Sequence, residues 1–226
     1  MCNLYNMTTN QDAIRDLVGT LNDNAGNLEP SIDFYPDRLA LVVRNSNGGH
    51  ELTKLTWGMP TPIEHLKSGA PDTGVTNIRK TWLPHWQQWL GIEHRCVVPV
   101  TAFCEYREIP DPVTKKKPKV WFALDRSEPL FFFAGIWTRW SGVRGSMKTP
   151  RPGEHDVFGF LTCAPNDVVG PIHPKAMPVM LTHKDEIETW LTADWKSAKA
   201  LQRPLPGDQM IIVEREEAPK QAGFLF

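Results

Sequence analysis

The stretch Arg95–Arg107 reads RCVVPVTAFCEYR, and its β-branched and aromatic residues decide the fold class. Such residues favour extended backbone, so we expect a strand along this stretch. Side chains two positions apart share one face of a strand, which puts Phe103 and Glu105 on the same side. This parity favours a buried Glu105. Burial would raise the pKa of its carboxyl into a range that suits proton transfer. A solvent-facing Glu105 on an alternating strand is the alternative.

Similar strand patterns lie on both sides of this stretch. Leu39–Arg44 and Leu52–Trp57 flank a turn at Asn45–Gly49 and predict a hairpin. Further strands are expected at Lys119–Leu124, Leu130–Trp137, Val157–Cys163, Met177–Leu181 and Met210–Glu214, with Phe131–Phe133 buried. Gly, Pro or polar residues are frequent in residues 22–37, 60–74 and 141–156. We expect loops there, the last of them long and basic.

Three short helices complete the predicted elements. Thr8 or Thr9 can cap the first, with an apolar face made by Ile14, Leu17, Val18 and Leu21. Thr182–Asp185 fits a capping box for a second helix, which contains Ile187, Trp190 and Leu191, and Lys196–Leu201 predicts a third. The sequence therefore predicts an α+β fold. We expect one domain over residues 1–226, with a curved, mainly antiparallel, barrel-like sheet and few short helices.

Composition limits the functional classes. The chain has 226 residues, of which 41% are hydrophobic and 23% charged, as is usual for a globular protein. No apolar run approaches the roughly 20 residues that cross a bilayer, and the N-terminus lacks a secretory pattern, so we expect a cytoplasmic protein without membrane contact. The net charge of −1 excludes a global basic field. Any nucleic-acid contact therefore needs a local patch, to which some of the nine tryptophans could add base stacking.

The four cysteines, at positions 2, 96, 104 and 163, show no CxxC spacing. This argues against a disulfide scaffold and against a metal site, and three of the four are expected to be buried thiols in strands. Cys2 differs because removal of Met1 would leave an α-amine and a thiol on one residue. Their reference pKa values lie near 8 and about 8.5, so each is partly nucleophilic at neutral pH. Such an aminothiol closes a thiazolidine ring with an aldehyde. Chance or packing is the alternative explanation.

Three further residues are candidates for a site. His173 lies between two prolines in Pro171–Pro174, and a rigid loop can hold an acid/base side chain in place. Asn77 can orient a hydroxyl or phosphate group, and Arg79 can bind a phosphate through two hydrogen bonds. For each of these residues an ordinary polar loop is the alternative.

Together these motifs resemble the SRAP family (SOS response-associated peptidase, also called abasic-site processing proteins). The resemblance covers nearly the whole chain. The matching segments are Met1–Tyr5, Trp57-Gly58, Thr76–Arg79, Cys96 to Tyr106, Ala134–Trp137, Phe160–Thr162 and Ile172-His173 leading to Met177–Val179. The order and spacing of Cys2, Asn77, Glu105 and His173 make the resemblance specific.

The resemblance implies a monomeric protein that binds single-stranded DNA and captures the aldehyde of an abasic site as a covalent crosslink. Cys2 would supply both nucleophiles, after self-removal of Met1. Glu105 would shuttle protons, and His173 would open the sugar and protonate leaving groups. Asn77 would act with them in catalysis by positioning the α-amine or the sugar. The implied DNA-binding residues are Asn77, Arg79 and Trp57. The electrophile is already present in the damaged DNA, so no metal or cofactor is needed, and an imine intermediate permits a lyase side activity.

The chain departs from the family pattern at three places. Asn3 and Leu4 stand where many members have Gly-Arg, Asp33–Pro36 lacks the usual Asn, and Lys175-Ala176 replaces two arginines. These differences concern the DNA contacts rather than the reacting groups.

Two other functions stay open. One is an N-terminal-nucleophile thiol peptidase or amidohydrolase that acts on proteins. The other is a non-catalytic single-stranded-DNA binder that uses tryptophans and the basic turn Lys115–Lys119.

Overall fold

A computed structural model describes residues 2–8, 11–19, 21–26, 32–46 and 49–215 of the chain. Within these residues the strands form one nine-stranded and one five-stranded sheet. The larger sheet follows the order β12 (Met177–Pro178), β11 (Thr149–Cys163), β10 (Phe131–Ser146), β7 (Arg95–Val100), β4 (Leu39–Ser46), β5 (Gly49–Trp57) and β2 (Leu21–Asp23). Two short strands join it, β6 (Asn77–Ile78) beside β11 and β13 (Met180–Leu181) beside β10.

The larger sheet closes on itself. Thr56 and Trp57 of β5 pair in parallel with Val157 and Phe158 of β11, while β4, β7 and β10 connect the same two strands on the other side. Closure removes most of the free strand edges and encloses a core. The expectation of a mainly antiparallel, barrel-like sheet in an α+β fold is therefore confirmed, including the predicted hairpin, which is β4–β5.

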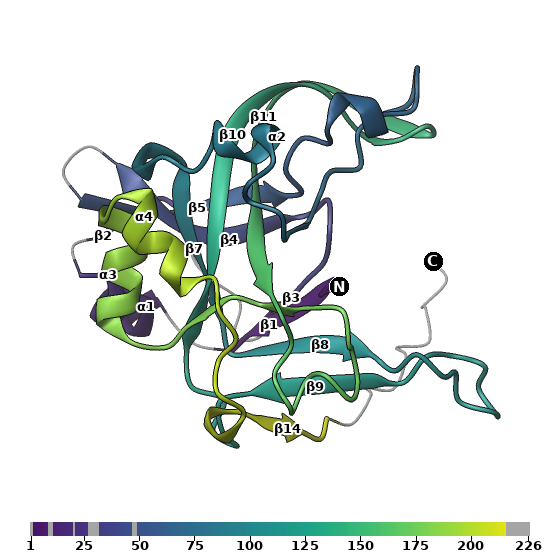
Figure 1. Cartoon of the computed structure of the whole chain (residues 1–226). Coiled ribbons are helices and arrows are strands. Elements are labelled where there is room, and N and C mark those ends of the chain that lie inside the picture. Colours follow the sequence, from purple (N-terminus) through teal and green to yellow (C-terminus); the bar gives the residue numbers. More distant parts are fainter. Residues whose placement is uncertain (1, 9–10, 20, 27–31, 47–48, 216–226) are drawn as a thin grey trace.

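The smaller sheet has the order β14 (Ile211–Val213), β9 (Lys119–Ala123), β8 (Ala102–Tyr106), β1 (Leu4–Met7) and β3 (Ile32–Phe34). In Figure 1 it lies below the barrel, and the N-terminus enters between the two sheets. The predicted loop over residues 22–37 is therefore partly wrong, because β2 reaches into it and β3 lies inside it. Both strands are only three residues long, too short for a periodic signal.

The run Arg95–Arg107 is not one strand but two, which belong to different sheets. The change of sheet occurs at Thr101, which is fully buried. Its backbone N–H donates to the carbonyl of Asn6 (2.9 Å), and its hydroxyl oxygen accepts from the N–H of Thr8 (3.2 Å). These contacts bend the chain without a glycine. The β-type pattern of residues therefore shows no break in the sequence, although the run passes from one sheet to the other.

The predicted long loop over residues 141–156 is wrong. These residues extend β10 and β11 into a paired ribbon, with register pairs that run from Ser141↔Glu154 to Ser146↔Thr149. Its Gly and Pro residues are typical of loops, but an exposed two-stranded ribbon can place Pro where no ladder hydrogen bond is needed. A cross-strand ion pair between Arg139 Nε and Asp156 Oδ1 (2.8 Å) supports the base of the ribbon.

The helices are short and cover one side of the barrel, as Figure 1 shows for α1 (Gln11–Val18), α3 (Lys184–Thr192) and α4 (Trp195–Ala198). The remaining helical segments are α2 (Pro84–Gln87) and the 3-10 turns Ile63–His65, Ile92–His94, Lys199–Leu201 and Gly207–Gln209. No helix among the described residues is both long and apolar enough to span a membrane.

All three predicted helices are present, with two differences. Glu186 rather than Asp185 completes the capping box of α3, because its carboxylate accepts from the N–H groups of Thr182 and His183 (2.9 and 3.3 Å). Leu21 belongs to β2 instead of to the first helix. Thr9, one of the two expected caps of that helix, lies outside the described residues.

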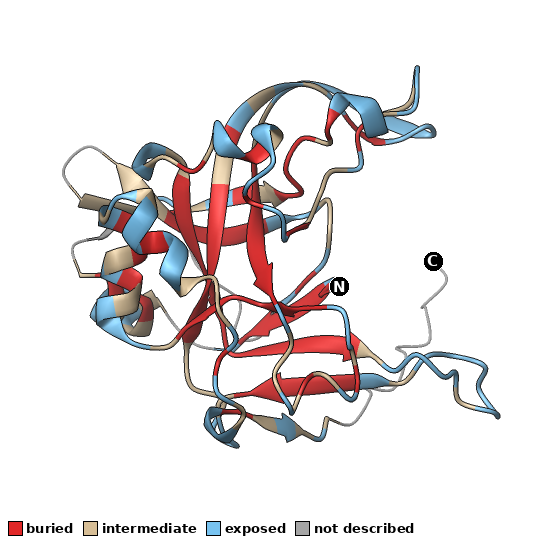
Figure 2. Ribbon diagram, viewed as in Figure 1, coloured by how far each residue is buried: buried red, intermediate tan, exposed pale blue. Residues whose placement is uncertain are grey.

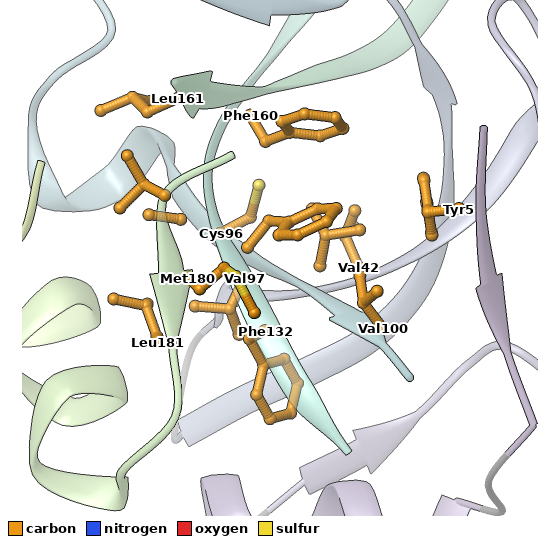
Figure 3. Close-up of a cluster of buried hydrophobic side chains, with 14 of the residues drawn as sticks. Tyr5, Val42, Cys96, Val97, Val100, Phe132, Phe160, Leu161, Met180 and Leu181 are labelled. Carbon is orange, nitrogen blue, oxygen red and sulfur yellow. The ribbon is translucent and has the colours of Figure 1, made fainter. Parts of the chain in front are cut away.

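One hydrophobic cluster fills the space between the two sheets and under the helices. Figure 2 shows buried residues along the strands and exposed ones on the outer helix faces. Figure 3 shows Tyr5 of β1 facing side chains from the larger sheet, among them Val42 and Phe160. The prediction that Phe131–Phe133 are buried is confirmed, as is the burial of Cys96, Cys104 and Cys163 in strands.

Candidate active site

Cys2 is brought to the molecular interior by the pairing of β1 with β8. Leu4 lies opposite Cys104 and Tyr5 opposite Phe103, so the residues just before β1 run alongside Glu105. Cys2 is 1% exposed, and its thiol donates to the carbonyl of Leu4 (3.5 Å). Burial raises the pKa of this thiol well above its usual value, and the nearby carboxyl of Glu105 raises it further. The thiol is therefore protonated at neutral pH in this state.

Glu105 lies in β8 with only 2% of its side chain exposed. The prediction of a buried carboxyl at this position is confirmed. Loss of hydration disfavours the charged form of the carboxyl and raises its pKa to about 7. A carboxyl group with this pKa can accept and release a proton at neutral pH.

His173 faces Glu105 from the loop between β11 and β12, with 3.8 Å between its Nδ1 and Glu105 Oε2. The loop is held by its own turn, in which the N–H of His173 donates to the carbonyl of Val169 (2.8 Å). Burial, together with nearby positive charge including that of Lys175, lowers the pKa of His173. Both shifts favour the neutral carboxyl and the neutral imidazole. The two groups are therefore better described as a pair that can share a proton than as a permanent ion pair.

Asn77 connects Cys2 to the barrel. It lies in β6, which pairs in parallel with β11 through Asn77↔Phe160. Its Nδ2 donates to the carbonyl of Cys2 (2.9 Å) and to the hydroxyl of Thr76 (2.8 Å). Its buried Oδ1 has no hydrogen-bond partner among the described residues. The amide therefore fixes the backbone of Cys2 and leaves one acceptor available at the site.

The geometry thus joins four residues from distant parts of the sequence: Cys2, Asn77, Glu105 and His173. Asn77 holds the backbone of Cys2, β1 lies beside the strand that carries Glu105, and Glu105 faces His173. The profile of the SOS response associated peptidase (SRAP) family matches residues 1–217. The chain belongs to the SRAP family.

Other SRAP-like proteins match over most of their length. The abasic site processing protein YoqW of Bacillus subtilis is 29% identical over 191 residues, which cover 82% of this chain and 78% of YoqW. YobE of the same organism is also named an abasic site processing protein. It is 28% identical, and the match covers 82% of this chain and 80% of YobE. A crystal structure from Bacteroides thetaiotaomicron shares the fold, with a TM-score of 0.69 and 20% identity over 94% of this chain and 92% of the other.

Two of the residues expected to bind DNA in this SRAP protein lie in very different places. Arg79 is at the surface, and its Nη1 is 3.5 Å from the carbonyl of Lys175, two residues beyond His173. Trp57 is 0% exposed and packs against Tyr5 and Phe160, so its ring is not available to a base. Instead its indole N–H donates to the carbonyl of Thr76 (3.1 Å), next to Asn77. Trp57 supports the site from the core and is not retained as a DNA contact.

Sequence patterns did not reveal Gln202, which holds the segment after Asn77. Its Nε2 donates to the carbonyls of Arg79 (2.9 Å) and Thr162 (3.0 Å), and its Oε1 accepts from the hydroxyl of Thr81 (2.9 Å). Gln202 is more than a hundred positions from Arg79 in the sequence, and no local motif marks it.

A hollow of 240 Å³ lies against the His173 loop. It is lined by Arg107, Glu108, Ile109, Gly170, Pro171, Ile172 and Pro174. Among the residues that the structure describes, no group of three or more His, Cys, Asp or Glu side chains is arranged to hold a metal ion.

Proposed function

We propose that this SRAP protein captures abasic sites in single-stranded DNA as a covalent crosslink through Cys2, acting as a monomer. The observation that carries the proposal is the position of Cys2, whose backbone is fixed by Asn77 beside the Glu105–His173 pair. The names of YoqW and YobE as abasic site processing proteins support the choice of lesion.

The reaction begins with hydrolysis of the peptide bond between Met1 and Cys2, which frees the α-amine of Cys2. The amine nitrogen then attacks the aldehyde carbon of the ring-opened abasic sugar, and loss of water gives an imine. The Cys2 sulfur adds to the imine carbon while its proton passes to the nitrogen, and a thiazolidine ring closes. The raised pKa of the thiol supports this order, because a protonated thiol leaves the first attack to the amine.

Glu105 and His173 handle the protons of these steps. A carboxyl with a pKa of about 7 can take a proton from water during removal of Met1 and return one to the water that leaves during imine formation. His173 helps to open the sugar and protonates leaving groups. Asn77 keeps the Cys2 backbone in register and offers its free Oδ1 to the amine or the sugar.

The imine also permits β-elimination of the 3′ phosphate, which would break the strand as a lyase does. Ring closure by the thiol competes with this step and protects the crosslink. The hollow beside the His173 loop supports access of a sugar-phosphate segment to Glu105 and His173. Its lining includes Arg107, two residues after Glu105, and the two neighbours of His173 in the chain, Ile172 and Pro174. A single-stranded lesion has no partner base to unpair, which lowers the cost of entry.

A denaturing-gel assay tests the proposal. Protein shown by mass spectrometry to begin at Cys2 is mixed with a single-stranded oligonucleotide that contains one abasic site, with the undamaged strand as control. We expect a slowly migrating band that survives boiling and forms only with the abasic strand. If protein without Met1 gives no such band, covalent capture is wrong, and peptide cleavage by an N-terminal cysteine becomes the leading hypothesis.

A further inference from the structure

Trp82 stands out because it is exposed at the surface. All nine tryptophans lie in the described part of the chain, and Trp82 is the exposed one, with 60% of its surface accessible. Its neighbour Leu83 is 40% exposed. A large aromatic side chain in water contributes little to folding, so its exposure needs another explanation.

The backbone under Trp82 is firmly held. Thr81 is 2% exposed and donates to Gln202, which also binds the carbonyl of Arg79. The N–H of Leu83 donates to the carbonyl of Lys80 (3.0 Å), which closes a turn that leads into α2. The indole ring is therefore displayed by an ordered turn that is tied to the barrel.

The surface around this turn is basic although the whole chain has a net charge of −1. Arg79 and Lys80 precede Trp82, and the Arg79 guanidinium contacts the backbone of Lys175. All three basic side chains are exposed, and none forms an ion pair within the described ranges. Their charge is thus available to phosphate groups, close to the loop that carries His173.

We propose that Trp82 is a stacking platform for a base that flanks the reacting nucleotide, while Arg79, Lys80 and Lys175 hold the adjoining phosphates. The inference rests on the proposed function, which places single-stranded DNA at the neighbouring site. A flat aromatic face beside free cations matches the alternation of bases and phosphates in a single strand. Every base has such a face, so the platform selects single-stranded character and not a sequence.

The test uses an oligonucleotide with a tetrahydrofuran abasic analogue, which has no aldehyde and therefore binds without crosslinking. A single 2-aminopurine is moved from one to four nucleotides away on either side of the analogue. We expect its fluorescence to be quenched at one position on one side only. Trp82→Ala should abolish that quenching and weaken affinity about 10-fold, the range of one base–aromatic stack.

Three comparisons make the result specific. Trp82→Phe keeps an aromatic face and should restore most of the affinity, and the salt dependence of binding should be unchanged in both variants because the phosphate contacts remain. Ile212→Ala, which removes an exposed apolar side chain from the edge strand β14, is the matched control and should bind like the unaltered protein.

The platform is overturned if no position is quenched or if Trp82→Ala binds as tightly as the unaltered protein. That outcome leaves the crosslinking assay untouched. Conversely, quenching that depends on Trp82 in a protein that forms no crosslink would support the platform while rejecting covalent capture.

Discussion

Two basic segments of this molecule differ in charge and in structural setting. The turn Lys115–Lys119 carries more lysines, but its loop between β8 and β9 is folded on itself around Asp111, whose carboxylate accepts from the N–H groups of Val113 and Thr114. In Figure 1 this loop projects away from the sheets. The segment Arg79–Leu83 is instead tied through Gln202 to a distant part of the chain and touches the backbone beside His173. Charge alone favours Lys115–Lys119 as a DNA contact, whereas anchoring and the contact beside His173 favour Arg79–Leu83.

Cys2→Ala has the largest expected effect, which is on crosslinking. In this variant the contributions of Arg79–Leu83 and Lys115–Lys119 to DNA affinity can be compared by reversible binding alone. Without the thiol the thiazolidine ring cannot close, so the boil-resistant band with abasic DNA should be lost completely. Reversible binding to the tetrahydrofuran strand should stay within about 2-fold, because Cys2 is buried and adds no charge. Gel crosslinking and fluorescence anisotropy measure the two quantities. A stable band from Cys2→Ala would assign the covalent bond to another residue.

In protein shown by mass spectrometry to begin at Cys2, Glu105→Gln should slow crosslinking about 100-fold, which is the usual contribution of a positioned proton-transfer group. The unaltered protein should lose rate as the pH passes a midpoint near 7, where the carboxyl gives up the proton it must donate, and the variant should lack this step. Single-turnover rates between pH 5.5 and 8.5 provide the measurement. An unchanged profile in Glu105→Gln would remove Glu105 from the proton transfers.

The stability of Glu105→Gln provides the control for this variant. The direction of the pKa shift of Glu105 determines whether the free energy of unfolding rises or falls with pH. The folded-state pKa of Glu105 is about 7 against an ordinary 4.5, so folding is disfavoured once the carboxyl ionises. The associated stability is present below about pH 4.5 and is lost as the pH rises through 7, by an amount on the order of 3 kcal/mol. Urea unfolding should therefore show a smaller decrease between pH 5 and pH 8 for Glu105→Gln. Slow crosslinking by such a variant cannot then be attributed to unfolding.

Much of this arrangement could be predicted from sequence, because the signals were local. The two-residue period that links Phe103 to Glu105 favoured a buried carboxyl, and the prolines around His173 indicated a held loop. The family resemblance then grouped these two residues with Cys2 and Asn77. The two failures have different causes. The bend at Thr101 depends on Asn6 and Thr8, which are far away in the sequence. The ribbon over residues 141–156 pairs locally between its own two halves, but its Gly and Pro residues are typical of loops.

The same reasoning explains the tryptophans. Trp82 follows Arg79 by three positions, whereas Trp57 lies twenty positions before Asn77, and residue type alone makes either of them a candidate for base stacking. Only the closure of the barrel, which puts β5 beside β11, buries Trp57 among aromatic rings. Only the anchoring of Thr81 by Gln202 displays Trp82. The exposure of a tryptophan depends on the assembled fold, so the sequence around Trp57 or Trp82 does not predict it.

The double substitution Arg79→Ala/Lys80→Ala should weaken binding to single-stranded DNA about 10-fold at moderate salt. Each lost phosphate contact lowers the slope of log affinity against log salt by about 0.7 for a single strand, so the two together should lower it by roughly 1.4. Anisotropy titrations at several salt concentrations measure the slope. Arg126→Ala, which removes an exposed cation from the turn after β9, is the matched control. An unchanged slope in the double variant would show that the phosphates bind elsewhere.

Lys115→Ala/Lys116→Ala/Lys117→Ala should have the smallest effect although it removes three charges. At about 150 mM salt the Debye length is roughly 8 Å, so lysines on a projecting loop contribute little to phosphates held beside His173. Affinity for the abasic-analogue strand should stay within about 2-fold, and maximal crosslinking should not change. A loss larger than that of Arg79→Ala/Lys80→Ala would reverse the order of the two segments and would place the main phosphate contacts on the β8–β9 loop. The hollow that this loop shares with the His173 segment would then become the path of the strand, and Trp82 would lie off it.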